Sequence, residues 1–299
     1  MQHLLFKIIY AIFYIFSLLP LRVLYVFSDI IAFVLRDIFQ YRKKVVLDNL
    51  QIAFPEKTQQ ERDRIAHEFY TRFCDSFLET LKLISISKEA LSKRFVCDLQ
   101  LLEDLHASSE RSITLALGHF FNWEMANLAV SLQNPYKQLL VYKKVENYVF
   151  ENMMLQLRGR FQAALLPTED FQSRFRSHAG EKYCLILVAD QNPYKHRHKA
   201  FWTTFFGRLV PFVKGPEKGA VINGNAVVFG KLTRVKRGYY KNELVLITAN
   251  ASETRRGEIT KKMAGLIEEN IKADPANYLW SHRRFKFVYS EENARNLIQ

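Results

Sequence analysis

Residues 113–125 have the sequence ITLALGHFFNWEM, and they carry the pattern that decides the fold. The first five form an apolar run that predicts a buried strand, because strands covered on both faces are apolar without alternation. The run ends at Gly118-His119, and residues 123–132 show the apolar face of a helix. A histidine is therefore expected at the exit of a strand, with Glu124 one turn into the helix that follows.

The five-residue spacing between His119 and Glu124 restricts where the histidine can lie. Five helical residues at about 100° each place two side chains some 140° apart on one helix. The two can meet only if His119 lies on the turn before the helix. Glu124 would then accept the proton on one imidazole nitrogen and leave the other free as a base. A capped turn followed by a surface carboxylate would give the same spacing, so the rest of the chain must decide.

The chain after residue 112 alternates short apolar runs with helical segments, which favours an α/β domain. Thr58-Gln59-Gln60-Glu61 is a capping-box pattern that opens a long helix to about Leu83. Phe69, Phe73 and Phe77 recur on one face of this helix and are expected to pack in the core. Strands are expected at 113–117, 139–142, 184–189, 227–229 and 244–247, and a late helix at about 254–272.

The first 35 residues are predicted to attach the chain to a membrane. Residues 4–19 are apolar except for Lys7, and a second apolar stretch, 23–35, follows Pro20. The first run is slightly short of the roughly 20 residues that a span needs. We therefore expect an anchor helix within residues 1–35 that spans the bilayer or lies in its interface, with a buried core helix as the alternative. Basic residues after the run predict that residues 36–299, a single domain, lie on the cytoplasmic side.

The composition points to an anionic partner. The net charge is +13 and 14% of the residues are aromatic, a balance that suits nucleic acid, an acidic membrane surface or a phosphorylated substrate. The three cysteines are widely spaced and form no disulfide or metal pattern, which indicates a reducing compartment. No metal site is expected at His196 and His198 either, because their neighbours are cationic.

Three stretches, 191–216, 231–241 and 282–286, combine basic residues with aromatic ones and contain no acidic residue. Such stretches are usually solvated faces. Together they predict a surface for an amphiphilic anion, with arginine on its phosphates and aromatic rings on its acyl chains.

At this point the chain resembles the late acyltransferases of lipid A biosynthesis, the lauroyl/myristoyl acyltransferase family. Gly118-His119 with Glu124 is similar to the family's His-x-x-x-x-Asp/Glu motif. The flanking blocks follow in the family's order: YRKKVVLDNL (41–50), ADQ (189–191), FFG (205–207) and LWSHRRFK (279–286). The chain departs from the family after FFG, where a Thr-Gly-containing segment is common. This departure puts the chain-length ruler or the acceptor pocket in doubt.

The resemblance implies a glycerol-3-phosphate-acyltransferase-like sheet flanked by helices, in a protein of the bacterial inner membrane with its active site on the cytoplasmic side. It implies an acyl carrier protein thioester as donor, a lipid A precursor as acceptor, and no cofactor or metal. His119 would be the base and Glu124 its orienting carboxylate. Arg158 or Arg160 would stabilise the oxyanion, and Asp190 would orient one of them or cap a helix. The residues expected to bind substrate are Lys195, Arg197, Arg208, Arg283 and Arg284.

Two alternatives remain open. One is an acyltransferase with another membrane lipid as acceptor, such as a glycerophospholipid or an aminolipid. The other is a non-catalytic protein that binds a membrane surface or nucleic acid through its basic aromatic stretches. Such a protein would have no use for His119 and Glu124, and a membrane anchor makes nucleic acid a poor candidate partner.

Overall fold

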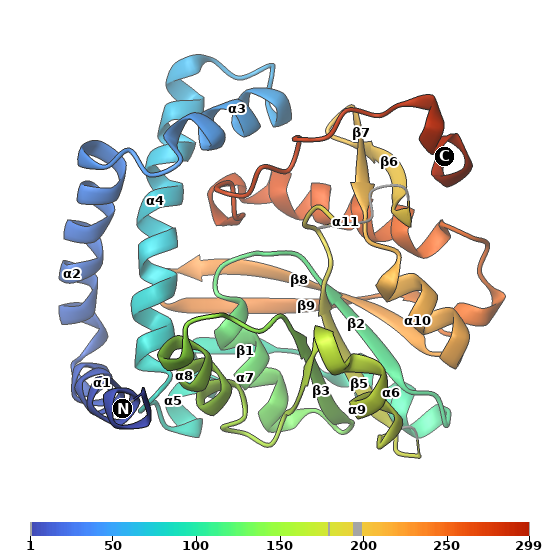
Figure 1. Ribbon diagram of the computed structural model, residues 1–299, viewed down its shortest axis with the longest axis horizontal. Coiled ribbons are helices and arrows are strands. Elements are labelled where there is room, and N and C mark those ends of the chain that lie inside the picture. Colours follow the sequence, from blue (N-terminus) through green and yellow to red (C-terminus); the bar gives the residue numbers. More distant parts are fainter. Residues whose placement is uncertain (1, 179, 194–198, 299) are drawn as a thin grey trace.

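A mostly parallel sheet forms the centre of the protein in the computed structural model, which describes residues 2–178, 180–193 and 199–298 (Figure 1). Within these residues the sheet has seven strands in the order β1-β9-β8-β2-β5-β3-β4. The expected α/β fold is confirmed, and β1 and β4 are strands that the sequence pattern missed. The strands are β1 (Phe95–Cys97), β2 (Ile113–Leu117), β3 (Lys137–Tyr142), β4 (Ala164–Pro167), β5 (Tyr183–Val188), β8 (Ala226–Lys236) and β9 (Tyr239–Thr248).

Strand β2 lies in the middle of the sheet. All five of its residues are buried, and it pairs in parallel with β5 on one side and β8 on the other. This double burial explains why the run is apolar at every position rather than at alternate ones. Leu117, the last residue of β2, is in register with Val188, the last residue of β5. Residues that follow these two strands therefore emerge side by side at one edge of the sheet.

Helices cover the sheet and extend beyond it (Figure 1). The expected capping box begins α4: Thr58 Oγ1 accepts from Glu61 N at 3.3 Å, and Glu61 Oε2 accepts from Thr58 N at 2.7 Å. Phe69 is buried as expected, whereas Phe77 is half exposed. From residue 43 onward the described α-helices are α3 (Lys43–Ala53), α4 (Gln59–Lys82), α5 (Lys88–Arg94), α6 (Gln100–Ser108), α7 (Trp123–Gln133), α8 (Tyr148–Arg158), α9 (Phe171–Arg176), α10 (Gly215–Asn223) and α11 (Glu258–Ala273).

A separate antiparallel hairpin, β6 (Phe201–Phe205) with β7 (Arg208–Phe212), replaces part of the expected basic surface. Phe206 and Gly207 form its turn with φ values of 48° and 70°, which suits a tight two-residue hairpin. Trp202, Phe205 and Phe212 are buried rather than displayed. The expected surface for an amphiphilic anion is therefore wrong for these aromatic residues, because most residues of both hairpin strands are buried.

The N-terminal residues form two helices, not one. Helix α1 (Gln2–Leu18) ends before Pro20, and α2 (Leu21–Phe33) begins after it and continues through a π-helical turn (Val34–Ile38). Among the described residues, no single helix is both long and apolar enough to cross a bilayer; α1 and Leu21–Ile38 reach that length and composition only as a pair, bent by 113°. The expected single anchor helix is thus corrected, because proline at position 20 starts a new helix.

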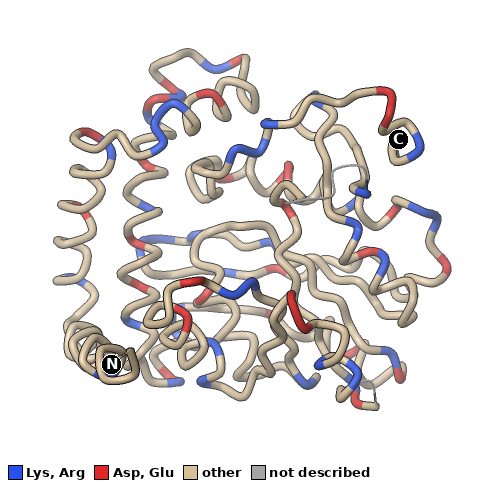
Figure 2. Tube along the Cα trace, viewed as in Figure 1, with Lys and Arg blue, Asp and Glu red and all other residues tan. Residues whose placement is uncertain are grey.

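Both helices leave large apolar side chains exposed. Lys7 is the one lysine, arginine, aspartate or glutamate in α1, and Figure 2 accordingly draws this helix almost wholly in tan. Exposed apolar residues are Leu4, Leu5, Ile8, Ile12, Ile15 and Phe16 on α1, and Val26, Phe27, Ile30, Ile31 and Phe33 on α2.

Polar contacts hold the other face of α2 against α4. Ser28 Oγ donates to the buried Asp75 at 2.7 Å, and Tyr25 Oη donates to Glu79 Oε1 at 2.9 Å. Arg237, at the β8–β9 turn, bridges Asp29 and Asp75 with contacts of 2.6 Å to each. Helix α2 is therefore fixed to the body of the protein along one side, while its opposite side is apolar and open.

Candidate active site

The loop from Gly118 to Asn122 leaves the end of β2 and is held by the chain near residue 278. Leu279 N donates to His119 O at 3.1 Å, and Phe121 N donates to Asn277 O at 3.0 Å. The side-chain amide of Asn277 returns a 3.0 Å bond to Phe121 O. A Cβ on Gly118 would lie 2.5 Å from the ring of Phe120, so glycine is required there. The backbone around His119 is therefore fixed by a segment far away in sequence.

His119 pairs with Asp190. Its Nδ1 lies 2.5 Å from Asp190 Oδ1, and its backbone N–H donates to Asp190 Oδ2 at 3.1 Å. The Asp190 side chain is 1% exposed and that of His119 is 20% exposed. Burial raises the pKa of Asp190, but the charge and hydrogen bonds of His119, with a further bond from Tyr278, outweigh it and lower the pKa to about 2. Asp190 is therefore ionised and fixes the proton on Nδ1, which leaves Nε2 as the basic nitrogen.

This pairing corrects the expected hydrogen bond between His119 and Glu124. The reason lies in the strand order, since β2 and β5 are neighbours and parallel. His119 and Asp190 each follow their strand by two residues, so both emerge at the same edge of the sheet. Ala189 N continues the ladder to Leu117 O at 3.1 Å and brings the carboxylate of Asp190 beside the loop.

Glu124 is bound instead by Arg158, at the end of α8. Arg158 Nε lies 3.0 Å from Glu124 Oε2, its Nη2 bonds Oε1, and Trp123 Nε1 donates to Oε1 at 3.1 Å. Burial alone would lower the pKa of Arg158, but the Glu124 carboxylate raises it above its ordinary value. The two-point contact fixes the guanidinium and keeps it charged. Arg158 is thus at the site as predicted, with Glu124 rather than Asp190 orienting it.

Two cavities meet at the Glu124–Arg158 pair. The first, of about 400 Å³, is lined by His119, Gln191 and Asn192 together with the pair. The second, of about 500 Å³, lies between α1, α4 and α8; its walls are mainly apolar and shared with the first at Trp123, Glu124, Phe150, Met154 and Arg158. The apolar side chains of this second cavity include Phe13, Phe77, Leu81, Met153 and Leu157. Half-exposed Phe77 therefore lines a cavity, which explains its departure from the core.

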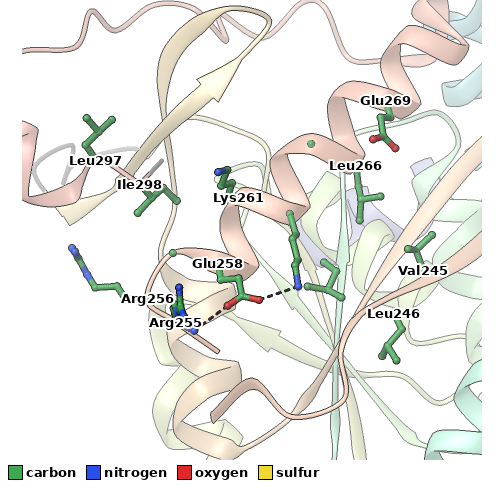
Figure 3. Close-up of a pocket in the computed structure, with 14 residues that line it drawn as sticks. Val245, Leu246, Arg255, Arg256, Glu258, Lys261, Leu266, Glu269, Leu297 and Ile298 are labelled. Carbon is green, nitrogen blue, oxygen red and sulfur yellow. Dashed lines mark hydrogen bonds and ion pairs between the residues drawn. The ribbon is translucent and has the colours of Figure 1, made fainter. Parts of the chain in front are cut away.

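A larger cavity, of about 890 Å³, is formed by α11, β9 and the C-terminal residues Leu297 and Ile298 (Figure 3). Its rim is charged, and Glu258 there accepts from Lys262 Nζ at 2.9 Å and from Arg255 N at 3.2 Å. Of these charged groups Glu258 is paired with Lys262, and the residues that line this cavity include no histidine. The smaller cavity at His119 is therefore the better candidate for acid–base chemistry.

The remaining predicted residues lie elsewhere. Arg160 donates to the carbonyls of Leu83 and Ile86, so it fastens the chain after α4 and does not line either cavity at Glu124. Arg208 and Arg283 are exposed. Lys195 and Arg197 lie outside the described residues. Five of the arginines predicted to bind substrate or the oxyanion have described side chains: Arg158, Arg160, Arg208, Arg283 and Arg284. Of these five, only Arg158 lines the cavities at Glu124.

Arg284 differs most from its expected role, since its side chain is wholly buried. Its Nη1 donates to Asn192 Oδ1 at 2.8 Å and to Pro211 O at 3.0 Å, and it stacks on Phe212. Burial lowers its pKa from the ordinary value. In this structure Arg284 is placed to orient Asn192, a wall residue of the His119 cavity, and cannot touch a substrate at the surface.

His282 supports the wall of the His119 cavity, and the sequence pattern did not single it out although it lies within the LWSHRRFK block. Its Nε2 accepts from Asn192 N at 3.2 Å, and burial lowers its pKa to about 4, so the ring is neutral at pH 7. Asn49 Nδ2 donates to the carbonyls of Trp280 and His282 at 2.7 and 2.8 Å. The YRKKVVLDNL block therefore supports the LWSHRRFK block, and both support the wall of the cavity.

The sequence also matches proteins of known activity. The family model described as bacterial lipid A biosynthesis acyltransferase matches residues 2–287. The lipid A biosynthesis palmitoleoyltransferase of Escherichia coli K12 is 24% identical over 272 residues, which is 90% of this chain and 86% of that protein. The lipid A biosynthesis lauroyltransferase of the same organism is 23% identical over 248 residues, 82% of this chain and 79% of that protein. A lipid A biosynthesis acyltransferase of Haemophilus influenzae is 23% identical over 261 residues, 82% and 78% respectively.

Proposed function

The chain belongs to the bacterial lipid A biosynthesis acyltransferase family, and on this premise we propose that it moves a fatty acyl chain from an acyl carrier protein thioester to a hydroxyl of a lipid A precursor. The observation that carries the proposal is the His119–Asp190 pair in a cavity that continues into an apolar one. A base beside a channel for hydrocarbon suits the transfer of an acyl chain to a hydroxyl.

His119 is the general base of this mechanism. Asp190 holds the proton on Nδ1, so Nε2 takes the proton of the acceptor hydroxyl while the hydroxyl oxygen attacks the thioester carbonyl. The buried carboxylate then stabilises the imidazolium. Collapse of the tetrahedral intermediate expels the thiolate of the carrier, which takes the proton back from Nε2. The products are an ester and a free thiol, and the histidine is regenerated.

Glu124 and Arg158 act as one unit in the same reaction. Arg158 donates to Glu124 through Nε and Nη2. Its Nη1 then faces the developing oxyanion. A charged donor fixed before the reaction lowers the barrier without reorganisation. Glu124 is thus a positioning residue, because its carboxylate orients the arginine rather than the histidine.

The apolar cavity between α1, α4 and α8 receives the donor's acyl chain in this proposal. Its walls offer Phe13, Phe77, Leu81, Met153 and Leu157, and its mouth is shared with the thioester site at Arg158. A chain lying there has its carbonyl carbon beside Nη1 and the acceptor hydroxyl beside His119. Burial of each methylene contributes about 0.8 kcal/mol, so the length of the cavity favours a particular chain.

Attachment to the anionic inner membrane, with the site on its cytoplasmic side, completes the proposal. The exposed apolar side chains of α1 and α2 would enter the acyl region, and the net charge of +13 would favour acidic head groups. Residues 1–35 would form the membrane-attachment segment and residues 36–299 the acyltransferase domain. An acceptor embedded in the same membrane then reaches the cavity without leaving it.

The test is acyl transfer by the purified full chain in detergent. The protein is incubated with an acyl carrier protein thioester and a lipid A precursor, and mass spectrometry follows the acceptor. We expect the precursor to gain one acyl chain, and His119→Ala to abolish the gain while the protein stays folded. Transfer to a glycerophospholipid but not to the lipid A precursor would replace the proposed acceptor. Full activity of His119→Ala would remove the proposed base.

A further inference from the structure

Glu79, in the last turn of α4, is a fully buried carboxylate held by neutral groups. Tyr25 Oη donates to its Oε1 at 2.9 Å, while Tyr240 Oη and Asn122 Nδ2 donate to its Oε2 at 2.7 and 3.2 Å. Among the described residues no lysine or arginine donates to it, although two arginines bond Asp75 one turn earlier on α4. Burial raises its pKa. A buried carboxyl group without a cationic partner is costly for folding, and such groups are enriched where they serve function.

Asn122 connects this carboxyl group to the active site. It is wholly buried and lies between His119 and Glu124 in the motif. Its Oδ1 accepts from Met125 N at 3.0 Å and so caps the N-terminus of α7. Its Nδ2 donates to Glu79 and, at 3.2 Å, to Ser76 O. Both amide hydrogens thus point at α4, and the carbonyl oxygen points at α7.

Only this orientation of the Asn122 amide satisfies both sides. Turned over, its NH₂ group would face the N–H of Met125 and its oxygen would face the carboxyl group of Glu79. Glu79 therefore selects the rotamer that caps α7. The first turn of α7 carries Glu124, and Glu124 in turn fixes Arg158. On the other side of the loop, Asn277 and Leu279 hold the backbone at His119 and Phe121.

We propose that Glu79 is a positioning residue for acyl transfer, acting through Asn122 to set the start of α7 and with it the Glu124–Arg158 pair. The inference rests on the proposed function and extends its machinery to a residue that touches neither substrate. A misplacement of about 1 Å at a reacting group can cost roughly 10²-fold in rate. Glu79 also holds Tyr25 and Tyr240, so a purely structural role is the competing account.

An exchange of chemical roles within the pair separates the two accounts. Asn122→Asp keeps the oxygen that caps α7 but places an acceptor against Glu79, and kcat should fall about 10²-fold with each KM little changed. Adding Glu79→Gln supplies a new donor, since its amide can bond one oxygen of the introduced aspartate while the other accepts from Met125 N. We expect the double variant to regain at least tenfold of the lost kcat. Ser76 O stays without its donor in both proteins, so recovery should be incomplete.

Glu217→Gln is the matched control. Glu217 is also buried, and it caps α11 through bonds from Thr260 N and Thr260 Oγ1 at 2.9 and 2.7 Å. This variant should lower Tm and leave kcat within about twofold of wild type, since α11 carries no residue of the site. Amide hydrogen exchange over residues 123–130 should be faster in Asn122→Asp, return toward wild type in the double variant, and stay unchanged in Glu217→Gln.

The outcomes are distinct. Two results would overturn the inference. One is a folded double variant that is as slow as Asn122→Asp. The other is a loss of kcat in Glu217→Gln as large as the loss in Asn122→Asp. Wild-type protein that transfers no acyl chain would instead overturn the proposed function. In that event amide hydrogen exchange still tests the contact between Glu79 and Asn122. Restored protection of residues 123–130 in the double variant would support the contact, and unrestored protection would refute it.

Discussion

Replacing Asp190 by asparagine tests which carboxylate sets the protonation of His119. Asp190 accepts two bonds from His119, one from Nδ1 at 2.5 Å and one from the backbone N–H at 3.1 Å. An asparagine has one acceptor for these two donors. If its oxygen keeps the backbone N–H, its NH₂ group faces Nδ1, and the proton must move to Nε2. The nitrogen that faces the cavity then cannot act as a base.

The expected loss follows from the function removed. General-base catalysis contributes roughly 10² to 10⁴ in rate, and we expect Asp190→Asn to lower kcat within that range. Glu124→Gln is the comparison, because it keeps an acceptor for Trp123 and Arg158 and leaves His119 untouched. Its loss should be smaller than the roughly 10² to 10³ caused by removing an oxyanion donor outright.

The assay is single-turnover transfer from an acyl carrier protein thioester, with full-length protein in detergent and Tm measured for each variant. The reasoning predicts that Asp190→Asn is slower than Glu124→Gln. The reverse order in folded proteins would show that Glu124, not Asp190, governs the base. An Asp190→Asn variant within about threefold of wild type would also refute the account, since general-base work contributes far more than that.

Three further outcomes are expected. Leu81→Trp fills part of the apolar cavity, so kcat/KM should fall more for long-chain than for short-chain donors in a thioester series; equal losses for all chain lengths would place the chain elsewhere. Folding lowers the pKa of His282 from 6.5 to about 4, so between these pH values the unfolded chain binds more protons than the folded protein. The free energy of unfolding should therefore drop by about 2–3 kcal/mol as pH falls from 6.5 to 4. His282→Gln should lack most of that drop when its unfolding is measured across the same range. Arg160→Ala removes two bonds to backbone carbonyls and should lower stability by about 2 kcal/mol with kcat unchanged, which thermal unfolding and turnover together check.

The sequence predicted the position of the candidate site better than the contacts between the residues of that site. An apolar run at Ile113–Leu117 is a local signal, and it correctly put His119 at a strand exit. The partner of His119 depends on which strands are neighbours, and no local spacing encodes that. Asp190 lies 71 residues further along the chain and meets His119 only because β5 lies beside β2. The pattern noted Asp190 at a strand end but assigned it to an arginine.

Composition misled where burial decides a residue's role. Arg284 belongs to a basic stretch and was expected at the surface, yet aromatic residues of the β6–β7 hairpin enclose it. The turn at Phe206-Gly207 was the available signal for that hairpin, and most residues of its two strands are buried. In the same way Pro20 was visible in the apolar N-terminal stretch but was not treated as the start of a second helix.

The contacts between the Gly118–Asn122 loop and the chain near residue 278 have a consequence for synthesis of the protein. The backbone groups of His119 and Phe121 bond Leu279 and Asn277, and Asn277 follows Phe121 by 156 residues. Protein synthesis therefore completes β2 and the loop long before it reaches the segment that closes the loop. We expect chains cut short before residue 277 to keep the whole motif, lose the clamp and therefore be inactive.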